Sequence, residues 1–344
     1  MPDLLDLLGR RPVVCAEGYL FECERRGYLQ AGAFVPEVVL DHPEVVEGLH
    51  REFVHAGTDV LEAFTYYGHR EKLRVLGKED ILEPLNRQAL SIAARVARET
   101  GTLLAGNLSN TNVYEPGAAA ERTVRSAFEE QVGWAAEAGV DFMIAETFSW
   151  LGEALLATSV VKEAGLTVVA TLAIHKDGTV REGIAPAEAC RQLEAAGADV
   201  VGLNCTRGPD TLLPMLEEVR RAVAVPVAGL PVPYRTTDRH PTFQSLDDPA
   251  TADLAVGGRT FPTALDPFTC SRYEIAEFAR RARDIGVDYL GVCCGAAPHH
   301  IRSMAEALGR TPAASRYTAD MSKHYSLGTD PSLRSANQEF AERL

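Results

Sequence analysis

The chain has 344 residues, of which 46 % are apolar and 24 % are charged, and its formal net charge is −14. This composition is typical of a globular protein and excludes a disordered, collagenous or membrane class. The acidic balance argues against nucleic acid and anionic lipid as partners, since both require a basic surface. Because no apolar run is long enough to cross a bilayer and the first residues are acidic, we expect a cytoplasmic protein.

Eight short and mostly apolar runs follow one another along the chain, which is typical of parallel strands buried on both faces. Helical patterns lie between them, the clearest at 120–138 and 272–285. Eight strand–helix units predict the α/β class and a (β/α)8 TIM barrel. The alternative is a doubly wound open sheet, which is disfavoured because no G-x-G-x-x-G follows the first run. The expected strands are 12–18, 58–65, 101–109, 140–147, 167–174, 198–205, 226–231 and 288–295.

Glycines predict where several of these helices end. A glycine that stands just before a strand is typical of a left-handed helix C-terminus, because it lacks the Cβ that disfavours positive φ. We therefore expect each of these residues to end a helix and to turn the chain into the next strand. They are Gly57, Gly101, Gly139, Gly165, Gly197 and Gly286.

Two segments lie outside this alternation. Residues 232–271 are rich in Pro, Thr, Asp and Gly, and a loop of this length is usually functional, so we expect a lid or a wall of the site. Residues 310–344 follow the eighth unit and are polar. We therefore expect a catalytic barrel over 1–309 and a C-terminal extension over 310–344, which is either a frayed tail or an arm that packs on another subunit.

The site of a (β/α)8 barrel lies at the C-terminal ends of its strands. Reading those ends selects a set of polar, aromatic and thiol side chains as candidates, together with two glycines. The set is Glu17, Gly18, Thr65, Tyr66, Tyr67, Asn107, Glu146, Thr147, Asn204, Cys205, Cys293, Cys294 and Gly295.

The cysteines predict a metal site. An odd total of seven does not suggest a disulfide framework in a cytoplasmic chain. Cys293 and Cys294 stand at a strand end that turns through Gly295, where both sulfurs can face one point, and Cys205 adds a third thiolate. Three thiolates and one open position are typical of catalytic zinc. The alternatives are buried core cysteines and a redox switch, while the lack of a C-x-x-C pattern disfavours a structural zinc ribbon.

A zinc ion with three thiolates holds a fourth thiolate well and removes its proton at neutral pH, which favours alkyl transfer onto a thiol over hydrolysis. Glu17 and Glu146 end apolar runs, so they either bind the ammonium group of an amino-acid substrate or act as acid and base. Carboxylates on a solvated rim are the alternative. Tyr66, Tyr67 and Phe34 form either an aromatic wall for a cationic methyl donor or plain packing.

With these residues identified, the chain resembles the zinc-dependent homocysteine S-methyltransferases, most closely their betaine–homocysteine branch. The resemblance runs over nearly the whole chain, and the cysteine motifs are shared by the whole family. The segments that carry it are RGYLQAG at 26–32, HPE at 42–44, LHREF at 49–53, AFTYY at 63–67, GLNC at 202–205, GVCCG at 291–295 and PHHI at 298–301.

The resemblance implies a barrel with Zn²⁺ on Cys205, Cys293 and Cys294, and with the thiolate of homocysteine as the fourth ligand. Glu146 matches the carboxylate that holds the homocysteine amino group. Glu17 and Gly18 match an Asp-Gly pair, with Glu in place of Asp. We assign Glu17 and Glu146 as catalytic residues. The predicted substrate-binding set comprises Glu17, Gly18, Phe34, Tyr66, Tyr67, Asn107, Glu146, Thr147 and Asn204.

The donor pocket departs from the betaine pattern at two positions. Tyr67 matches a tyrosine of that pocket, but Phe34 replaces a tryptophan, and Thr147 replaces a tyrosine and is typical of the S-methylmethionine branch. The resemblance therefore implies methyl transfer to homocysteine from betaine or a related onium donor, with S-methylmethionine as the alternative. A different thiol acceptor, or a non-catalytic zinc- or thiol-binding barrel, also stays open. The family further implies a homo-oligomer, either a dimer or a tetramer.

Overall fold

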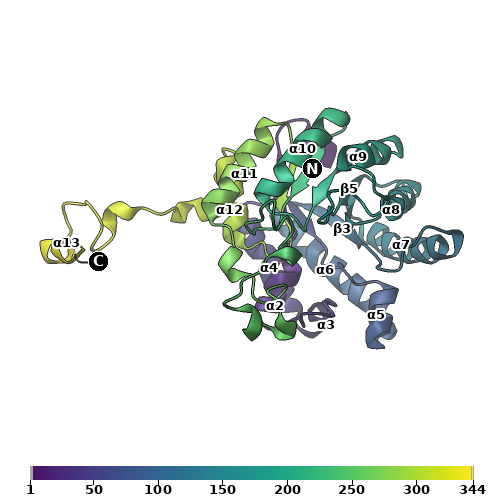
Figure 1. The fold of residues 1–344 in the computed structure, drawn as a ribbon, viewed down its shortest axis with the longest axis horizontal. Coiled ribbons are helices and arrows are strands. Elements are labelled where there is room, and N and C mark those ends of the chain that lie inside the picture. The colour runs from purple at the N-terminus through teal and green to yellow at the C-terminus, as the bar shows by residue number, and fades with distance from the viewer. Residues whose placement is uncertain (1–2, 342, 344) are drawn as a thin grey trace.

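Eight parallel strands close into a barrel in the computed structural model, which describes residues 3–341 and 343. Each strand pairs with the next along the chain, and β1 closes the barrel by pairing with β8 (Figure 1). The predicted (β/α)8 barrel is confirmed. The strands are β1 (Val13–Ala16), β2 (Val60–Glu62), β3 (Leu103–Ser109), β4 (Phe142–Phe148), β5 (Val168–Leu172), β6 (Val200–Asn204), β7 (Val227–Leu230) and β8 (Tyr289–Val292).

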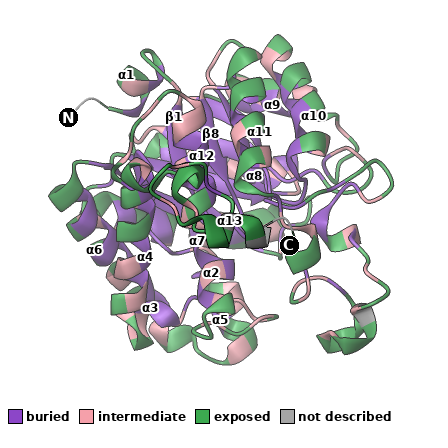
Figure 2. Ribbon diagram, turned by 90° about the vertical axis from the view of Figure 1, so that its left-hand side faces the viewer, coloured by how far each residue is buried: buried purple, intermediate pink, exposed green. Residues whose placement is uncertain are grey.

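Helices surround the strands, with buried faces toward the sheet and exposed faces toward solvent (Figure 2). None of them, within the described residues, is long and apolar enough to span a bilayer. The longer helices are α4 (Pro43–Ala56), α6 (Leu82–Thr100), α7 (Ala118–Ala138), α8 (Leu151–Glu163), α9 (Pro186–Ala195), α10 (Pro209–Ala222), α11 (Arg272–Asp284) and α12 (Pro298–Ala307). The shorter ones are α1 (Leu4–Leu8), α2 (Tyr19–Arg25), α3 (Val38–Asp41), α5 (Arg70–Leu76) and α13 (Ser335–Ala341).

The six glycines predicted to end helices all have positive φ, between 72° and 105°. Four of them belong to a repeated Gly-x-Asp sequence that precedes every even-numbered strand. In each repeat the aspartate side chain accepts a hydrogen bond from a backbone N–H at the start of the preceding odd-numbered strand, which fixes the register between the two strands. The four bonds join Asp59 to Val14, Asp141 to Leu104, Asp199 to Val168 and Asp288 to Val227.

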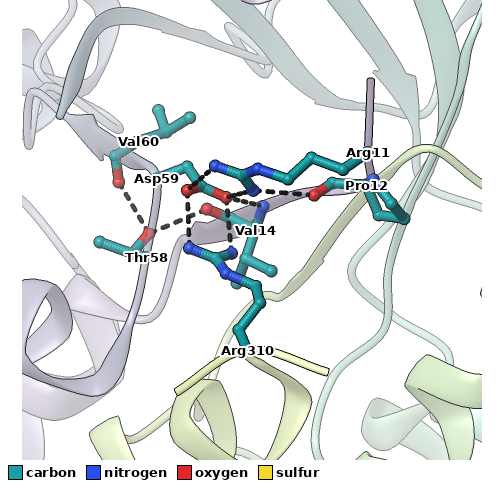
Figure 3. Close-up of polar contacts among 7 residues, drawn as sticks. All are labelled: Arg11, Pro12, Val14, Thr58, Asp59, Val60 and Arg310. Carbon is teal, nitrogen blue, oxygen red and sulfur yellow. Dashed lines mark hydrogen bonds and ion pairs between the residues drawn. The ribbon is translucent and has the colours of Figure 1, made fainter. Parts of the chain in front are cut away.

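Asp59 has an additional role, because two guanidinium groups bind its carboxylate from opposite sides (Figure 3). Arg11 donates to both Asp59 oxygens over 2.8 and 3.0 Å, and Arg310 donates to both over 2.7 Å. The carboxylate is nearly buried, with 8 % of its side-chain surface exposed. This cluster therefore fastens Arg310, three residues beyond the end of α12, to the N-terminal end of the barrel.

We expect Asp59→Asn to lower the free energy of unfolding by roughly 2–4 kcal/mol, because it leaves two guanidinium groups beside an uncharged amide. Arg11 is partly exposed, so this loss should be smaller than that for a fully buried ion pair. Asp141→Asn is the matched control. The structure gives Asp141 no ion pair among the described residues, and an asparagine oxygen can still accept the Leu104 N–H. Urea denaturation measures both, and equal losses in the two variants would contradict a special role for the Asp59 cluster.

The long connection after β7 forms a wall of the site, which is one of the two roles expected for it. Between 232 and 271 it contains only short 3₁₀ turns, including Phe243–Ser245 and Asp266–Phe268. Phe243, Gln244 and Phe261 line the main cavity at the C-terminal ends of the strands. The tip of the connection, with Leu254 and Val256, is exposed.

The C-terminal extension has two parts. The first contacts the barrel through Arg310 and through a 3₁₀ turn at Ala313–Tyr317, where Ala314 is buried. The second leaves the barrel and ends in α13 at a distance from the other helices (Figure 1). Because Arg310 and Ala314 pack on the barrel, the boundary expected at 309/310 does not coincide with the point at which the chain departs from it.

Candidate functional site

A cavity of about 480 Å³ lies at the C-terminal ends of the strands. One wall is aromatic, and Phe21, Phe34, Tyr66, Tyr67, Phe243 and Phe261 contribute to it. The Tyr66 and Tyr67 rings lie 4.5 Å apart, and Phe34 stacks on Phe21 at 5.8 Å. The three aromatic residues predicted from the sequence therefore line one cavity, with the electron-rich ring faces that an onium cation requires.

Backbone strain is concentrated around this cavity. Six non-glycine residues among those described have a positive φ, and all six line it. Such conformations cost on the order of 1–3 kcal/mol each and persist where the surrounding structure holds them, most often at functional sites. The six residues are Phe34, Tyr67, Asn112, Thr147, Cys205 and Thr206.

Three cysteine sulfurs meet beside the cavity, because the chain turns at the ends of β6 and β8, and Cys205 and Cys294 line it. The Sγ atom of Cys294 lies 3.7 Å from that of Cys205 and 3.9 Å from that of Cys293. A tetrahedral zinc ion with bonds of about 2.3 Å to sulfur sets its ligand sulfurs roughly 3.8 Å apart, so the donor set fits that ion. β8 ends at Val292, which frees both vicinal cysteines from the alternation of a strand.

The three thiols share protons. Hydrogen bonding with Cys293 and Cys294 lowers the pKa of Cys205 well below its ordinary value, while the same contacts raise the pKa of Cys293. One thiolate is therefore stabilised within the cluster even before a metal binds, which is the protonation state that metal coordination requires.

Glu146 lies beside the sulfurs and is held by amide side chains. Its Oε1 atom accepts a hydrogen bond from Asn107 at 2.8 Å, and its Oε2 atom accepts one from Asn204 at 2.6 Å and one from Thr147 at 3.1 Å. Burial, followed by the charge of Cys205, raises the pKa of Glu146 to about 7. A nearby cation such as an ammonium group would favour the ionised form.

Two further carboxylates converge on the same point. Glu17 and Glu62 are buried, and their burial together with the charge of Glu146 raises the pKa of each well above the ordinary value. Asn107 donates a hydrogen bond to Glu62, whereas the Oε1 atom of Glu17 is buried without a partner. An unpaired buried oxygen among three carboxylates is the environment that an ammonium ligand would satisfy.

The carboxylates and sulfurs enclose a second cavity of about 20 Å³, which shares Leu20, Tyr66 and Cys294 with the larger one. It is too small for an amino acid, so side chains must move for one to enter. The sequence analysis missed Glu62. The sequence feature that could have identified Glu62 is a carboxylate at the end of an apolar run, as at Glu146. The second strand was expected to end at Thr65, whereas β2 ends at Glu62.

Gly18 is a predicted substrate-binding residue to which the structure gives a packing role. A Cβ atom at this position would lie 2.5 Å from the carbonyl oxygen of Ala296, so only glycine allows the chain after β1 to approach the chain after β8. His175 and Arg181, which follow β5 and line the large cavity, were not predicted from the sequence. We had assigned no candidate to that strand end.

Comparison with known proteins agrees with this geometry. A family model described as homocysteine S-methyltransferase matches residues 20–308. Betaine–homocysteine S-methyltransferase 1 of Danio rerio is 35 % identical over 99 % of this chain and 85 % of its own length. S-methylmethionine–homocysteine S-methyltransferase BHMT2 of Rattus norvegicus is 34 % identical over 99 % of this chain and 92 % of its own length.

A solved structure supports the fold. The metallated form of the homocysteine methyltransferase MmuM from Escherichia coli superposes with a TM-score of 0.67 and 16 % identity, over 87 % of this chain and 98 % of that one. The extent of the family match and the level of identity to the curated relatives decide the classification: this chain belongs to the homocysteine S-methyltransferase family.

Proposed function

We propose that this protein transfers a methyl group from a small onium donor, with betaine as the first candidate, to the sulfur of homocysteine to give methionine. The observation that carries the proposal is the meeting of three cysteine sulfurs, a cluster of buried carboxylates and an aromatic wall at two adjoining cavities. Each group suits one part of the reaction: thiol binding, ammonium binding and onium binding.

Cys205, Cys293 and Cys294 would hold the zinc ion, which when bound supplies a site that lowers the pKa of the substrate thiol. Glu146 and Glu17 would bind the substrate ammonium group, which pairs with the Glu17 oxygen that has no other partner. Asn107 and Asn204 hold Glu146 in place through their amide groups. The substrate sulfur is thereby directed toward the large cavity.

The aromatic wall would hold the donor with one methyl group facing the substrate sulfur. In the transfer a sulfur–carbon bond forms as the nitrogen–carbon bond of betaine breaks. The electron pair of the broken bond stays on nitrogen, which leaves as a neutral tertiary amine.

The test is methionine formation from homocysteine with betaine, dimethylsulfoniopropionate, S-methylmethionine and S-adenosylmethionine as separate donors. We expect betaine to be used. S-methylmethionine is the second candidate, because Thr147 lines the cavity where the betaine branch has tyrosine. No methionine from any donor, with zinc bound, would refute the proposal and favour a non-catalytic thiol-binding barrel. The cytoplasmic location stays a prediction.

We also propose that the part of the C-terminal extension that leaves the barrel joins two copies of the chain. Tyr325 and Leu327 on this part are 60 % and 57 % exposed. Apolar side chains so exposed on an extended segment are typical of an interface. A dimer is the smallest assembly that this arm can form, and a tetramer would require a further contact.

We expect Tyr325→Ser combined with Leu327→Ser to shift the chain toward the monomer, since it removes apolar area from the proposed contact. Light scattering across a concentration series measures the change. The control is Leu254→Ser with Val256→Ser, which removes two apolar groups, each 84 % exposed, from the connection after β7. An unchanged mass in the arm variant, or a monomeric starting protein, would contradict the proposal.

A further inference from the structure

The large cavity contains one permanently positive side chain. Of the residues that line it, Arg181 is the only arginine or lysine, and no aspartate or glutamate is among them. Cys205 and Cys294 of the sulfur cluster line the same cavity. The lining therefore presents two of the cysteine sulfurs and one positive side chain to one space of about 480 Å³.

Local contacts hold Arg181 in position. Its backbone N–H donates to the carbonyl of Ser149 at 2.8 Å. The adjacent Glu182 accepts hydrogen bonds from the backbone N–H groups of Leu151 and Gly152, at 2.9 and 2.8 Å. These contacts tie the segment after β5 to the start of α8, so the arginine is placed before any ligand arrives.

The guanidinium group has no acidic partner of its own. Within residues 3–341 and 343 it makes no ion pair, and its described contact is with the face of Trp150, 4.7 Å from the ring centroid. Glu182, which is the next residue, and Glu153, on which the charge of Arg181 acts, have other donors. Glu182 binds the backbone of α8, and Glu153 accepts from both the backbone and the hydroxyl of Thr111.

Two further polar side chains line the cavity with Arg181. His175 and Ser149 both belong to its lining, and the Nε2 atom of His175 lies 2.7 Å from the Ser149 hydroxyl. Hydrogen-bonding groups therefore accompany the guanidinium group in this space.

We propose that Arg181, with His175 and Ser149 beside it, binds the carboxylate of the methyl donor, so that the donor is a zwitterion whose onium end faces the sulfurs. This inference rests on the proposed function and deepens it by naming the donor class. The lining offers a guanidinium group for the carboxylate of the donor, and an aromatic wall beside Cys205 and Cys294 for its onium group. Binding at the carboxylate end would point the onium methyl group toward Cys205 and Cys294 and reject cations that lack an acid group.

The experiment measures the binding of betaine and of tetramethylammonium by calorimetry, and methionine formation from betaine, in the zinc-loaded protein. Arg181→Gln should weaken betaine binding and raise its KM by roughly 10- to 100-fold, as expected for a lost charge-assisted hydrogen bond. The kcat should change much less. Tetramethylammonium binding should stay within about twofold because this ion has no carboxylate.

Arg181→Lys should recover part of the betaine affinity because it keeps the charge but not the two-pronged geometry. Arg272→Gln is the matched control, since that guanidinium also lies over an aromatic ring, 5.7 Å from the centroid of Tyr273, and lines none of the cavities described here. It should bind betaine as the wild type does.

The outcomes separate this inference from the proposed function. The carboxylate site would be overturned if Arg181→Gln lost equal affinity for betaine and tetramethylammonium, or lost no affinity for betaine. A wild-type protein that binds no betaine would also overturn it. Arg181-dependent betaine binding without methionine formation from any donor of the panel would support the carboxylate site and refute the methyl transfer. Methionine formation with an unchanged KM for betaine in Arg181→Gln would support the methyl transfer and overturn the carboxylate site.

Discussion

Cys293→Ala is expected to remove bound zinc and to lower methionine formation by more than about 100-fold, since losing even a partner of a metal ligand costs 10- to 100-fold. The sulfur of Cys293 lies 3.9 Å from that of Cys294, within a cluster of three. Two remaining thiolates leave a tetrahedral ion with two protein ligands, which is fewer than catalytic zinc sites use. Elemental analysis of the purified protein measures the zinc, and circular dichroism shows whether the barrel still folds.

Cys190→Ala is the control for this variant. Cys190 is also a buried free thiol, but it lies on α9, and its sulfur contacts only the carbonyl of Gly202 among the hydrogen bonds of the described chain. It should keep its zinc and its activity, apart from a small loss of stability for a deleted buried group. Unchanged zinc in Cys293→Ala would overturn the metal assignment, whereas zinc loss in both variants would indicate a general effect on folding.

Glu146→Gln is expected to raise the KM for homocysteine by roughly 10- to 100-fold, because it removes the charge that would bind the substrate ammonium group. The substitution keeps the size of the side chain. The penalty should be absent for 4-mercaptobutyrate, which is homocysteine without its amino group, and this comparison separates ammonium binding from a general disturbance of the site. Glu153→Gln, a buried glutamate held by Thr111, is the control and should keep the wild-type KM.

The same residue predicts a pH dependence. Only the ionised form of Glu146 binds an ammonium group well, and burial raises the pKa of this carboxyl to about 7. Homocysteine affinity should therefore fall as the pH decreases through this region, at a higher pH than for an exposed glutamate. Glu146→Gln should remove this step from the pH profile of kcat/KM, and a profile that is identical in the variant would contradict the assignment.

Local patterns in the chain were sufficient for the fold. Apolar runs located the eight strands, and glycines at helix ends located the turns between them, because burial on both faces and positive φ each restrict the residue type. The residues at which the strands end were harder to predict than the strands themselves. β2 is only three residues long, Val60–Glu62, and the apolar pattern continues past it, so Glu62 was not recognised as a site residue.

The cysteines and Glu146 could be found in advance because thiols and a carboxylate at strand ends are unusual in apolar runs and match a known family. Arg181 and His175 could not, since they stand in a polar loop where a charged residue carries no local signal. Their position depends on contacts with the preceding strand–helix unit. Arg181 donates a backbone hydrogen bond to Ser149, and Glu182 binds the start of α8. The hydrogen bonds that the repeated Gly-x-Asp aspartates accept also join distant parts of the chain, so their contribution to stability could not be predicted from local sequence patterns.

The amino-acid sequence by itself determined the barrel, the family and the residue types available for zinc and for the substrate amino group. Only the tertiary structure decided that three carboxylates share one pocket, that six strained residues surround one cavity, and that an arginine without an ion pair lines this cavity together with Cys205 and Cys294. The physical reason is that periodicity and capping act over a few residues, whereas charge complementarity depends on distances between strand ends that the chain brings together only when the barrel closes.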